Sequence, residues 1–175
     1  MGWLDPVFVG LSFIGYAGLV WIALAFPIAL RARRSGPLAL GLTAACVWSA
    51  DLIALGIKAA TGRPRPFETI PEAHKLIGAT VGQSMPSGHA ATSFAGAVVL
   101  VYLLPRAAPF VFALAIAIAF SRVYVGVHYP SDVLVGAALG AAVGLAGIAL
   151  VRAHVRALRP TSEDRPRSAG APPAG

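Results

Sequence analysis

The sequence is poor in charge and contains almost no cysteine. Only 12% of its 175 residues are charged and seven are acidic, whereas 57% are hydrophobic. A chain this apolar and this poor in charge is not an ordinary soluble domain. The single cysteine, Cys46, excludes an internal disulfide, and its place inside an apolar run favours a packing role.

Two further absences narrow the class of protein. The first eight residues contain no basic stretch ahead of an apolar run, which argues against a cleaved signal peptide. The net charge is +7, but the basic residues gather at the ends of apolar runs, where they set membrane topology. We therefore expect a membrane protein that does not bind nucleic acid.

Long apolar runs predict an all-α, integral-membrane helical bundle of about five transmembrane helices. The expected spans cover about residues 6–30, 37–57, 86–104, 109–127 and 131–151. They form one transmembrane domain over residues 1–159. The remaining residues, 160–175, are rich in proline, alanine, serine and charge, and we expect a disordered tail.

The distribution of arginine predicts how the chain sits in the membrane. With five spans the termini lie on opposite sides, and most arginines fall on the side of the tail. The positive-inside rule makes that side cytoplasmic, in a plasma membrane. Residues 58–85 and 121–132, two stretches with polar side chains, then share the outer face.

The stretch 121–132, SRVYVGVHYPSD, holds candidate catalytic residues. A carboxylate at Asp132 could keep one ring nitrogen of His128 protonated and leave the other as a base or nucleophile. Arg122 offers a planar fork of donors that suits phosphate oxygens. The same residue types are also ordinary at a membrane interface, and this stretch alone leaves both interpretations open.

Two other positions could bind an anion on the same face. Lys58 ends the second span and Arg65 follows in a proline-stiffened turn, so both could reach one phosphate, or both could simply meet lipid head groups. For Arg63 and Lys75 we favour the lipid interpretation.

The third span opens with Pro-Ser-Gly-His. Ser87 and Gly88 suit a helix start, whose free N–H groups bind anions, and His89 could donate a proton there. A plain capped helix is the alternative.

Together these pieces resemble the three-part signature of the type 2 phosphatidic acid phosphatase superfamily. The matching residues are Lys58-x6-Arg65-Pro66, Pro86-Ser87-Gly88-His89 and Ser121-Arg122-x5-His128-x3-Asp132. The superfamily contains membrane lipid phosphate phosphatases, and its phosphate pocket is shared with vanadium haloperoxidases. Many membrane members have six spans, whereas this sequence predicts five.

The resemblance implies a role for each matching residue. His128 would be the nucleophile that forms a phosphohistidine, and Asp132 would orient it. His89 would protonate the leaving oxygen and later activate water. The phosphoryl oxygens would be held by Lys58, Arg65, Ser87, the Gly88 amide and Arg122. Phosphoryl transfer needs mostly positioning and charge neutralisation, which agrees with this set.

These implications lead to one predicted function. We expect a lipid phosphate phosphatase acting on the outer face on a polyprenyl (di)phosphate or a phosphatidyl-type phosphate, with bacterial envelope chemistry as a weaker suggestion. No spacing among the few acids suggests a metal cage, so we expect neither metal nor cofactor. The alternatives are a transporter or flippase for phosphorylated lipids and a haloperoxidase-like enzyme.

Three remaining features have structural interpretations. Asp51 lies within the second span, two turns before Lys58, and we expect it to be a buried structural acid. His74 and His154 receive no functional role. Gly136, Gly140 and Gly144 on the last span indicate close helix packing or the interface of a homodimer.

Overall fold

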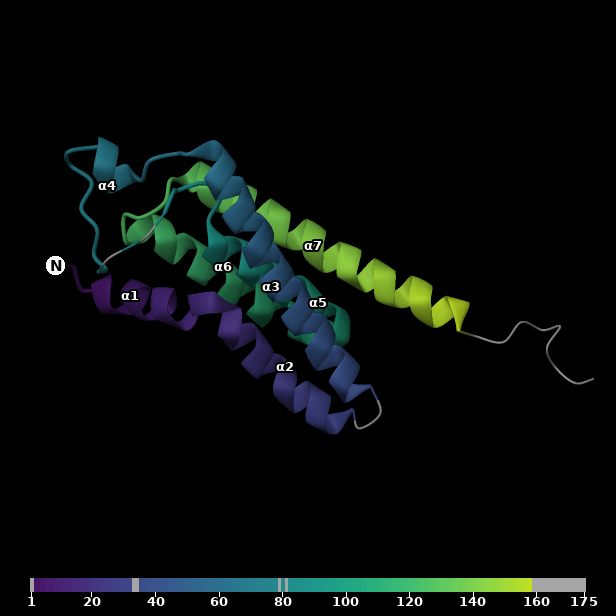
Figure 1. Ribbon diagram of the computed structural model, residues 1–175. Coiled ribbons are helices and arrows are strands. Elements are labelled where there is room, and N and C mark those ends of the chain that lie inside the picture. Colours follow the sequence, from purple (N-terminus) through teal and green to yellow (C-terminus); the bar gives the residue numbers. More distant parts are fainter. Residues whose placement is uncertain (1, 33–34, 79, 81, 159–175) are drawn as a thin grey trace, which may run out of the picture.

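The computed structural model describes residues 2–32, 35–78, 80 and 82–158, and all regular structure in these ranges is helical (Figure 1). The elements are α1 (Asp5–Ile14), η1 (Tyr16–Gly18), α2 (Leu19–Arg31), α3 (Gly36–Thr61), α4 (Pro66–Thr69), α5 (Gly88–Leu103), η2 (Pro105–Ala107), α6 (Ala108–Tyr124) and α7 (Pro130–Ala157). The predicted all-α bundle is confirmed. The predicted tail, 160–175, lies outside the described residues.

The first predicted span, 6–30, is broken into two helices. The segments Asp5–Ile14 and Tyr16–Arg31 meet at a bend of 48°. Ala17 and Gly18 have φ values of 51° and 67°, and such left-handed backbone interrupts an α-helix. Because of the bend, α1 turns aside from the direction of α2 and packs along α6 (Figure 1).

Among the described residues, three to four helices, rather than five, are long and apolar enough to cross a membrane. Three segments qualify alone, Gly36–Thr69 with α3, Pro105–Tyr124 with α6 and Pro130–Ala157 with α7, and the bent first pair makes a fourth candidate. The predicted third span is shorter than expected: α5 has 16 residues, about 24 Å of helix against a hydrocarbon core of roughly 30 Å. Packing against α2, α3, α6 and α7 surrounds α5 with protein, so it need not match the bilayer thickness.

Small residues allow α5 and α7 to pack closely. Gly136, Gly140 and Gly144 on α7 are buried, and a Cβ added at Gly140 would collide with the backbone of Ala91 on α5. Close helix packing within the chain is therefore confirmed. The alternative prediction, that this glycine face forms a homodimer interface, is wrong because α5 already covers the face.

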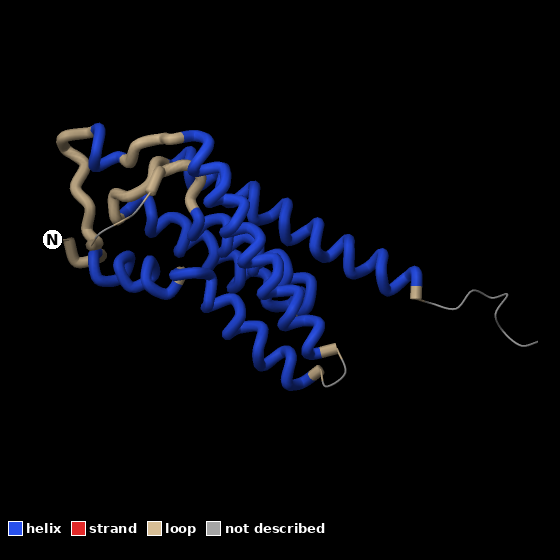
Figure 2. Tube along the Cα trace, in the orientation of Figure 1, coloured by secondary structure: helices blue, strands red, loops and turns tan. Residues whose placement is uncertain are grey.

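The polar segments gather at one end of the bundle. Figure 2 shows the loops around α4, between α6 and α7, and before α5 close together at the end near the N-terminus. On the outside of the helices, large apolar side chains such as Leu52, Leu134 and Leu150 are about 70% exposed, as lipid-facing residues would be. The fold thus brings the three sequence motifs to one end of an apolar bundle.

Candidate active site

A cavity of about 660 Å³ lies at this end and collects the motif residues. Its charged and titratable lining consists of Asp51, Lys58, Arg65, His89, Arg122 and His128. Gly88 also lines it, whereas Ser87 and Asp132 are fully buried and do not. On the apolar side lie Phe13, Tyr16, Ala17 and Leu55. The structure therefore brings six of the eight predicted site residues to one cavity wall.

His128 sits in the short connection between α6 and α7. Gly126 makes the turn with a φ of 76°, and a Cβ there would collide with the backbone of His74. The His128 ring is buried, with Nδ1 3.5 Å from Asp132 Oδ2 and Nε2 3.5 Å from an Arg65 guanidinium nitrogen. Since arginine can only donate, this orientation suits a lone pair on Nε2 and a proton on Nδ1.

The surroundings of His128 keep its ring neutral. Burial is the main cause that lowers the pKa of His128, to about 4. The hydrogen bond to Asp132 opposes this shift, and the positive charges of Lys58, Arg65 and Arg122 add to it. A neutral imidazole with a free lone pair is the form that attacks phosphorus.

Asp132 is held by more partners than the sequence predicted. Its Oδ2 accepts hydrogen bonds from the Ser84 hydroxyl and, at 2.9 Å, from the Tyr129 backbone N–H. Its Oδ1 accepts from Arg63 at 2.7 Å. Ser84 was not predicted as a site residue, and it lies in a loop with no regular pattern that could have indicated it.

The interpretation of Arg63 as a residue that merely faces lipid is wrong. Its guanidinium pairs with Asp132, donates to the Ser131 hydroxyl at 2.8 Å and lies 4.1 Å from the centre of the Tyr129 ring. Arg63 and Arg65 alternate with prolines in an extended segment, where every second side chain points to the same side. The pattern Arg-Pro-Arg-Pro could therefore have indicated that Arg63 lies at the site together with Arg65. By contrast, Lys75 lies over the Phe67 ring and does not line the cavity, and its contact with lipid head groups stays a prediction.

Two of the three motif cations, Lys58 and Arg65, are fixed by backbone carbonyls. Lys58 donates to the carbonyl oxygens of Gln83 and Ser84, at 3.0 and 3.2 Å. Arg65 is buried and donates to Gly82 and Val127, both at 2.9 Å. These carbonyls hold each side chain in one position beside the cavity.

The start of α5 forms as predicted. Ser87 caps the helix, and its hydroxyl accepts from the backbone N–H of Ala90 at 3.4 Å. His89, in the first turn, lines the cavity. Its Nε2–H donates to the backbone carbonyl of Ser12 on α1 at 3.0 Å.

Ser12 also contacts the third motif. One Arg122 guanidinium nitrogen donates to the Ser12 hydroxyl, while Arg122 Nε is buried without a hydrogen-bond partner among the described residues. The Thr80 hydroxyl also lines the cavity, and it too is buried without a hydrogen-bond partner among the described residues. Buried donors without partners are costly unless a ligand satisfies them, so both suit a cavity that binds an oxyanion. The sequence did not indicate Ser12, because it lies in an apolar run far from the motifs.

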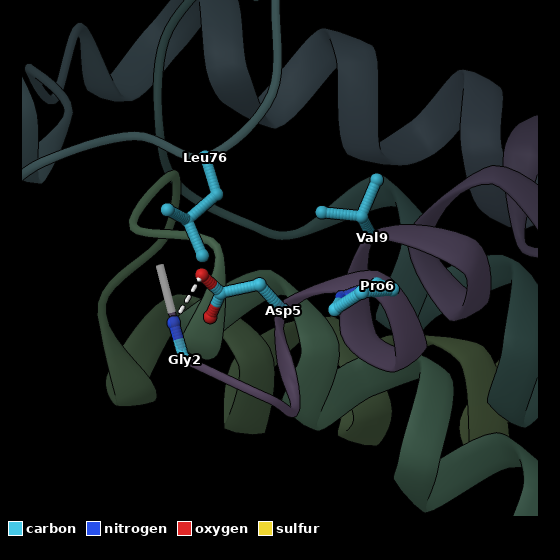
Figure 3. Close-up of a pocket in the computed structure, with 5 residues that line it drawn as sticks. All are labelled: Gly2, Asp5, Pro6, Val9 and Leu76. Atoms are coloured by element: carbon cyan, nitrogen blue, oxygen red, sulfur yellow. Dashed lines mark hydrogen bonds between the residues drawn. The ribbon is translucent and has the colours of Figure 1, made fainter.

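A second, smaller cavity of about 300 Å³ lies where α1 meets the loop after α4 (Figure 3). Asp5 accepts hydrogen bonds from the Gly2 backbone N–H at 2.8 Å and from the Tyr124 hydroxyl at 3.0 Å. The other side chains that line this cavity, those of Pro6, Val9 and Leu76, are apolar. Asp5 therefore fastens the start of α1 to α6, and this cavity lacks the cations of the larger one.

The remaining predictions concern metals and isolated residues. Within the described part of the chain, no three His, Cys, Asp or Glu side chains cluster as metal ligands would. Asp51, predicted to be structural, lines the large cavity instead. His154 is exposed near the end of α7.

Comparison with known proteins agrees with this geometry. The profile of the PAP2 superfamily matches residues 36–156. A decaprenylphosphoryl-5-phosphoribose phosphatase of Mycobacterium tuberculosis is 40% identical over 143 residues, which cover 77% of this chain and 73% of that protein.

Two solved structures share the fold. The PAP2-type phosphatidylglycerolphosphate phosphatase of Bacillus subtilis matches with a TM-score of 0.67 at 25% identity, over 91% of this chain and 80% of that one. LpxE of Aquifex aeolicus matches with a TM-score of 0.69 at 23% identity, over 85% and 87% of the two chains. The chain is a multi-pass membrane phosphatase and belongs to the PAP2 superfamily of lipid phosphate phosphatases.

Proposed function

We propose that this protein hydrolyses a phosphomonoester on a polyprenyl-linked lipid through a phosphohistidine at His128. The observation that carries the proposal is a buried, neutral imidazole, backed by Asp132, whose Nε2 faces a cavity lined by Lys58, Arg65 and Arg122. Fixed cations around a nucleophile neutralise the charge of a transferring phosphoryl group.

In the first step the Nε2 lone pair of His128 attacks phosphorus. The P–N bond forms while the P–O bond to the leaving group breaks, and its electron pair stays on the leaving oxygen. That oxygen takes a proton from His89. Because the Ser12 carbonyl already accepts from Nε2 of His89, the transferred proton is the one on Nδ1. His89 therefore enters this step as the imidazolium, protonated on both nitrogens, a form that the negative phosphate favours, and leaves it neutral.

In the second step water attacks the phosphohistidine. The P–N bond breaks, its electron pair returns to Nε2 of His128, and Nδ1 of His89 takes a proton from the water. Inorganic phosphate leaves, and both rings return to their starting states. Asp132 accepts the Nδ1–H of His128 throughout and stabilises the positive charge that forms on the ring.

The lining of the cavity supports a lipid substrate. Phe13 and Tyr16 are 71% and 68% exposed, and with Leu55 they form an apolar wall beside the cationic side chains. A hydrocarbon chain could pass along this wall while its phosphate meets the cations. The similarity to a decaprenylphosphoryl-5-phosphoribose phosphatase favours a polyprenyl-linked substrate over a phosphatidyl lipid.

The proposed site faces the outer side of the plasma membrane. The arginine distribution supports this orientation, because Arg31, Arg106 and Arg152 lie at the opposite end of the bundle from the cavity. In a Cys46→Ser background, a cysteine replacing Glu72 should react with an impermeant thiol reagent added to intact cells. One replacing Ala157 should react only after the cells are opened, and the reverse pattern would contradict the orientation.

Phosphate release from purified protein tests the function. We expect release from a polyprenyl-phosphoryl sugar phosphate in the presence of EDTA, and inhibition by vanadate, which mimics the five-coordinate phosphoryl group. Activity that disappears in EDTA and returns with Mg²⁺ would contradict the metal-free mechanism. Binding of the lipids without phosphate release would favour the transporter hypothesis.

A further inference from the structure

Asp51 is an acid in the large cavity to which the phosphatase mechanism gives no role. It lies on α3 and lines the cavity together with Leu55 and Lys58. A Cβ added at Gly88 would lie 3.0 Å from Asp51 Oδ1, so the carboxylate lies directly against the first turn of α5. No group in the described residues donates a hydrogen bond to it.

The positive charge of Lys58 acts on Asp51, but no hydrogen bond among the described residues satisfies its carboxylate. Acids inside membrane segments are normally paired or hydrogen-bonded, because an unsatisfied carboxylate is costly there. Asp51 is only partly buried and opens into the cavity. Its acceptor oxygens are therefore available to a ligand in the cavity.

The position of Asp51 relates it to the leaving group. Seven residues before Lys58, it lies about 10 Å further along the α3 axis, away from the motif loops. On α5, Thr92 follows His89 by about one turn and also lines the cavity. His89 is the proposed proton donor to the leaving oxygen, and Asp51 lies against Gly88, the residue before it, so a leaving group that reaches His89 also comes within reach of Asp51.

The chemistry of this position separates two classes of lipid phosphate. In a diphosphate the leaving group begins with a second phosphate, which a carboxylate would repel. In a phosphorylated sugar lipid the leaving group begins with a hydroxylated ring, whose O–H groups can donate to a carboxylate. The Thr92 hydroxyl donates to the His89 carbonyl at 3.2 Å and keeps its lone pairs for a further donor.

We propose that Asp51 determines specificity, selecting a hydroxyl-rich leaving group, such as a sugar between the scissile phosphate and the lipid, over a second phosphate. This inference rests on the proposed function, and it adds a residue outside the three motifs to the substrate site.

The test compares two substrates of equal prenyl chain length, a polyprenyl-phosphoryl pentose 5-phosphate and a polyprenyl diphosphate. The wild type should favour the sugar phosphate in kcat/KM. Asp51→Asn keeps the size of the side chain and removes the charge, so it should shift the ratio of the two kcat/KM values toward the diphosphate by about 10-fold to 100-fold, the range for a hydrogen bond to a charged group. Glu72→Gln, an exposed acid outside the cavity, is the matched control and should leave the ratio unchanged.

The outcomes separate this inference from the proposed function. Equal loss on both substrates, or no change on either, would assign Asp51 a structural role or none and overturn the inference alone. Failure of the wild type to release phosphate from any lipid would overturn both. If Asp51→Asn does not accumulate, Thr92→Val is the second variant. It should lower kcat/KM severalfold for the sugar phosphate and leave kcat/KM for the diphosphate unchanged. An equal loss on both substrates would also overturn the inference.

Discussion

The two sides of the cavity hold their histidines in different ways. On one side, His128 is backed by Asp132, which is itself fixed by Arg63, Ser84 and the Tyr129 backbone. On the other side, His89 is held by one backbone carbonyl, that of Ser12. In the described part of the chain, the proposed nucleophile is thus supported by a network of charged and hydroxyl groups, whereas the proposed proton donor has one hydrogen bond, to a neutral carbonyl.

The two sides also come from different parts of the chain. The network around His128 lies within residues 36–156, which match the superfamily. The contact to His89 comes from α1, outside that range. The part of the chain that matches the superfamily therefore contains the proposed nucleophile with its supports, whereas a helix outside that part contacts the proposed acid. Substitutions on each side can test this division.

The largest effect is expected from Asp132→Asn. An amide keeps the shape but cannot stabilise the charged ring, and it favours the wrong tautomer of His128. Loss of the equivalent carboxylate in a serine protease costs about 10⁴-fold in kcat, so we expect a loss of about 10³-fold or more here. Steady-state phosphate release measures it, and a loss below tenfold would show that Asp132 does not support the nucleophile.

Arg122 lies between the two sides and should come next. Arg122→Lys keeps the charge but loses both the unpartnered Nε donor and the planar fork. We expect a loss of about 10²-fold in kcat/KM, the range for one preorganised transition-state donor. Full activity with lysine would show that charge alone is needed at this position.

Arg63→Ala should have a moderate effect on the nucleophile side. It removes one of the donors to Asp132, but its side chain is 34% exposed, so solvent weakens the pair. We expect a loss of about tenfold in the rate of phosphoenzyme formation. Arg106→Ala, at the other end of the bundle, is the matched control, and equal effects at both arginines would remove Arg63 from the network.

Ser12→Ala should have the smallest effect. It removes the hydroxyl that accepts from Arg122 but keeps the backbone carbonyl that holds His89. We expect a loss of about threefold to tenfold, close to the value of one hydrogen bond. Ser49→Ala, exposed on α3, is the control. A loss as large as that of Asp132→Asn would show that the contacts of Ser12 matter as much as the network around His128.

Much of the fold and the site could be predicted because local sequence carries the signals. Apolar runs gave the helical bundle, and the spacing of Lys58, Arg65, His89, Arg122 and His128 placed them on one face. The bend in the first span could not be predicted, because Ala17 and Gly18 adopt left-handed backbone within an uninterrupted apolar run.

The supports of the site were harder to predict. Ser12 and Ser84 are ordinary serines that become part of the site only through tertiary contacts. Asp51 was predicted to be structural because acids inside membrane helices are usually buried and paired. The sequence could not show that Asp51 lines the same cavity as Lys58.

Trapping the phosphoenzyme is the most direct test of the central claim, that His128 forms a covalent intermediate. His89→Ala should slow release of a lipid leaving group by about 10² to 10⁴-fold. With p-nitrophenyl phosphate, whose leaving group needs little protonation, this variant should give a burst of p-nitrophenol and an acid-labile, base-stable phosphoenzyme that mass spectrometry maps to His128. The double variant with His128→Ala should show neither. A phosphoenzyme that persists without His128, or one that maps to another residue, would contradict the account.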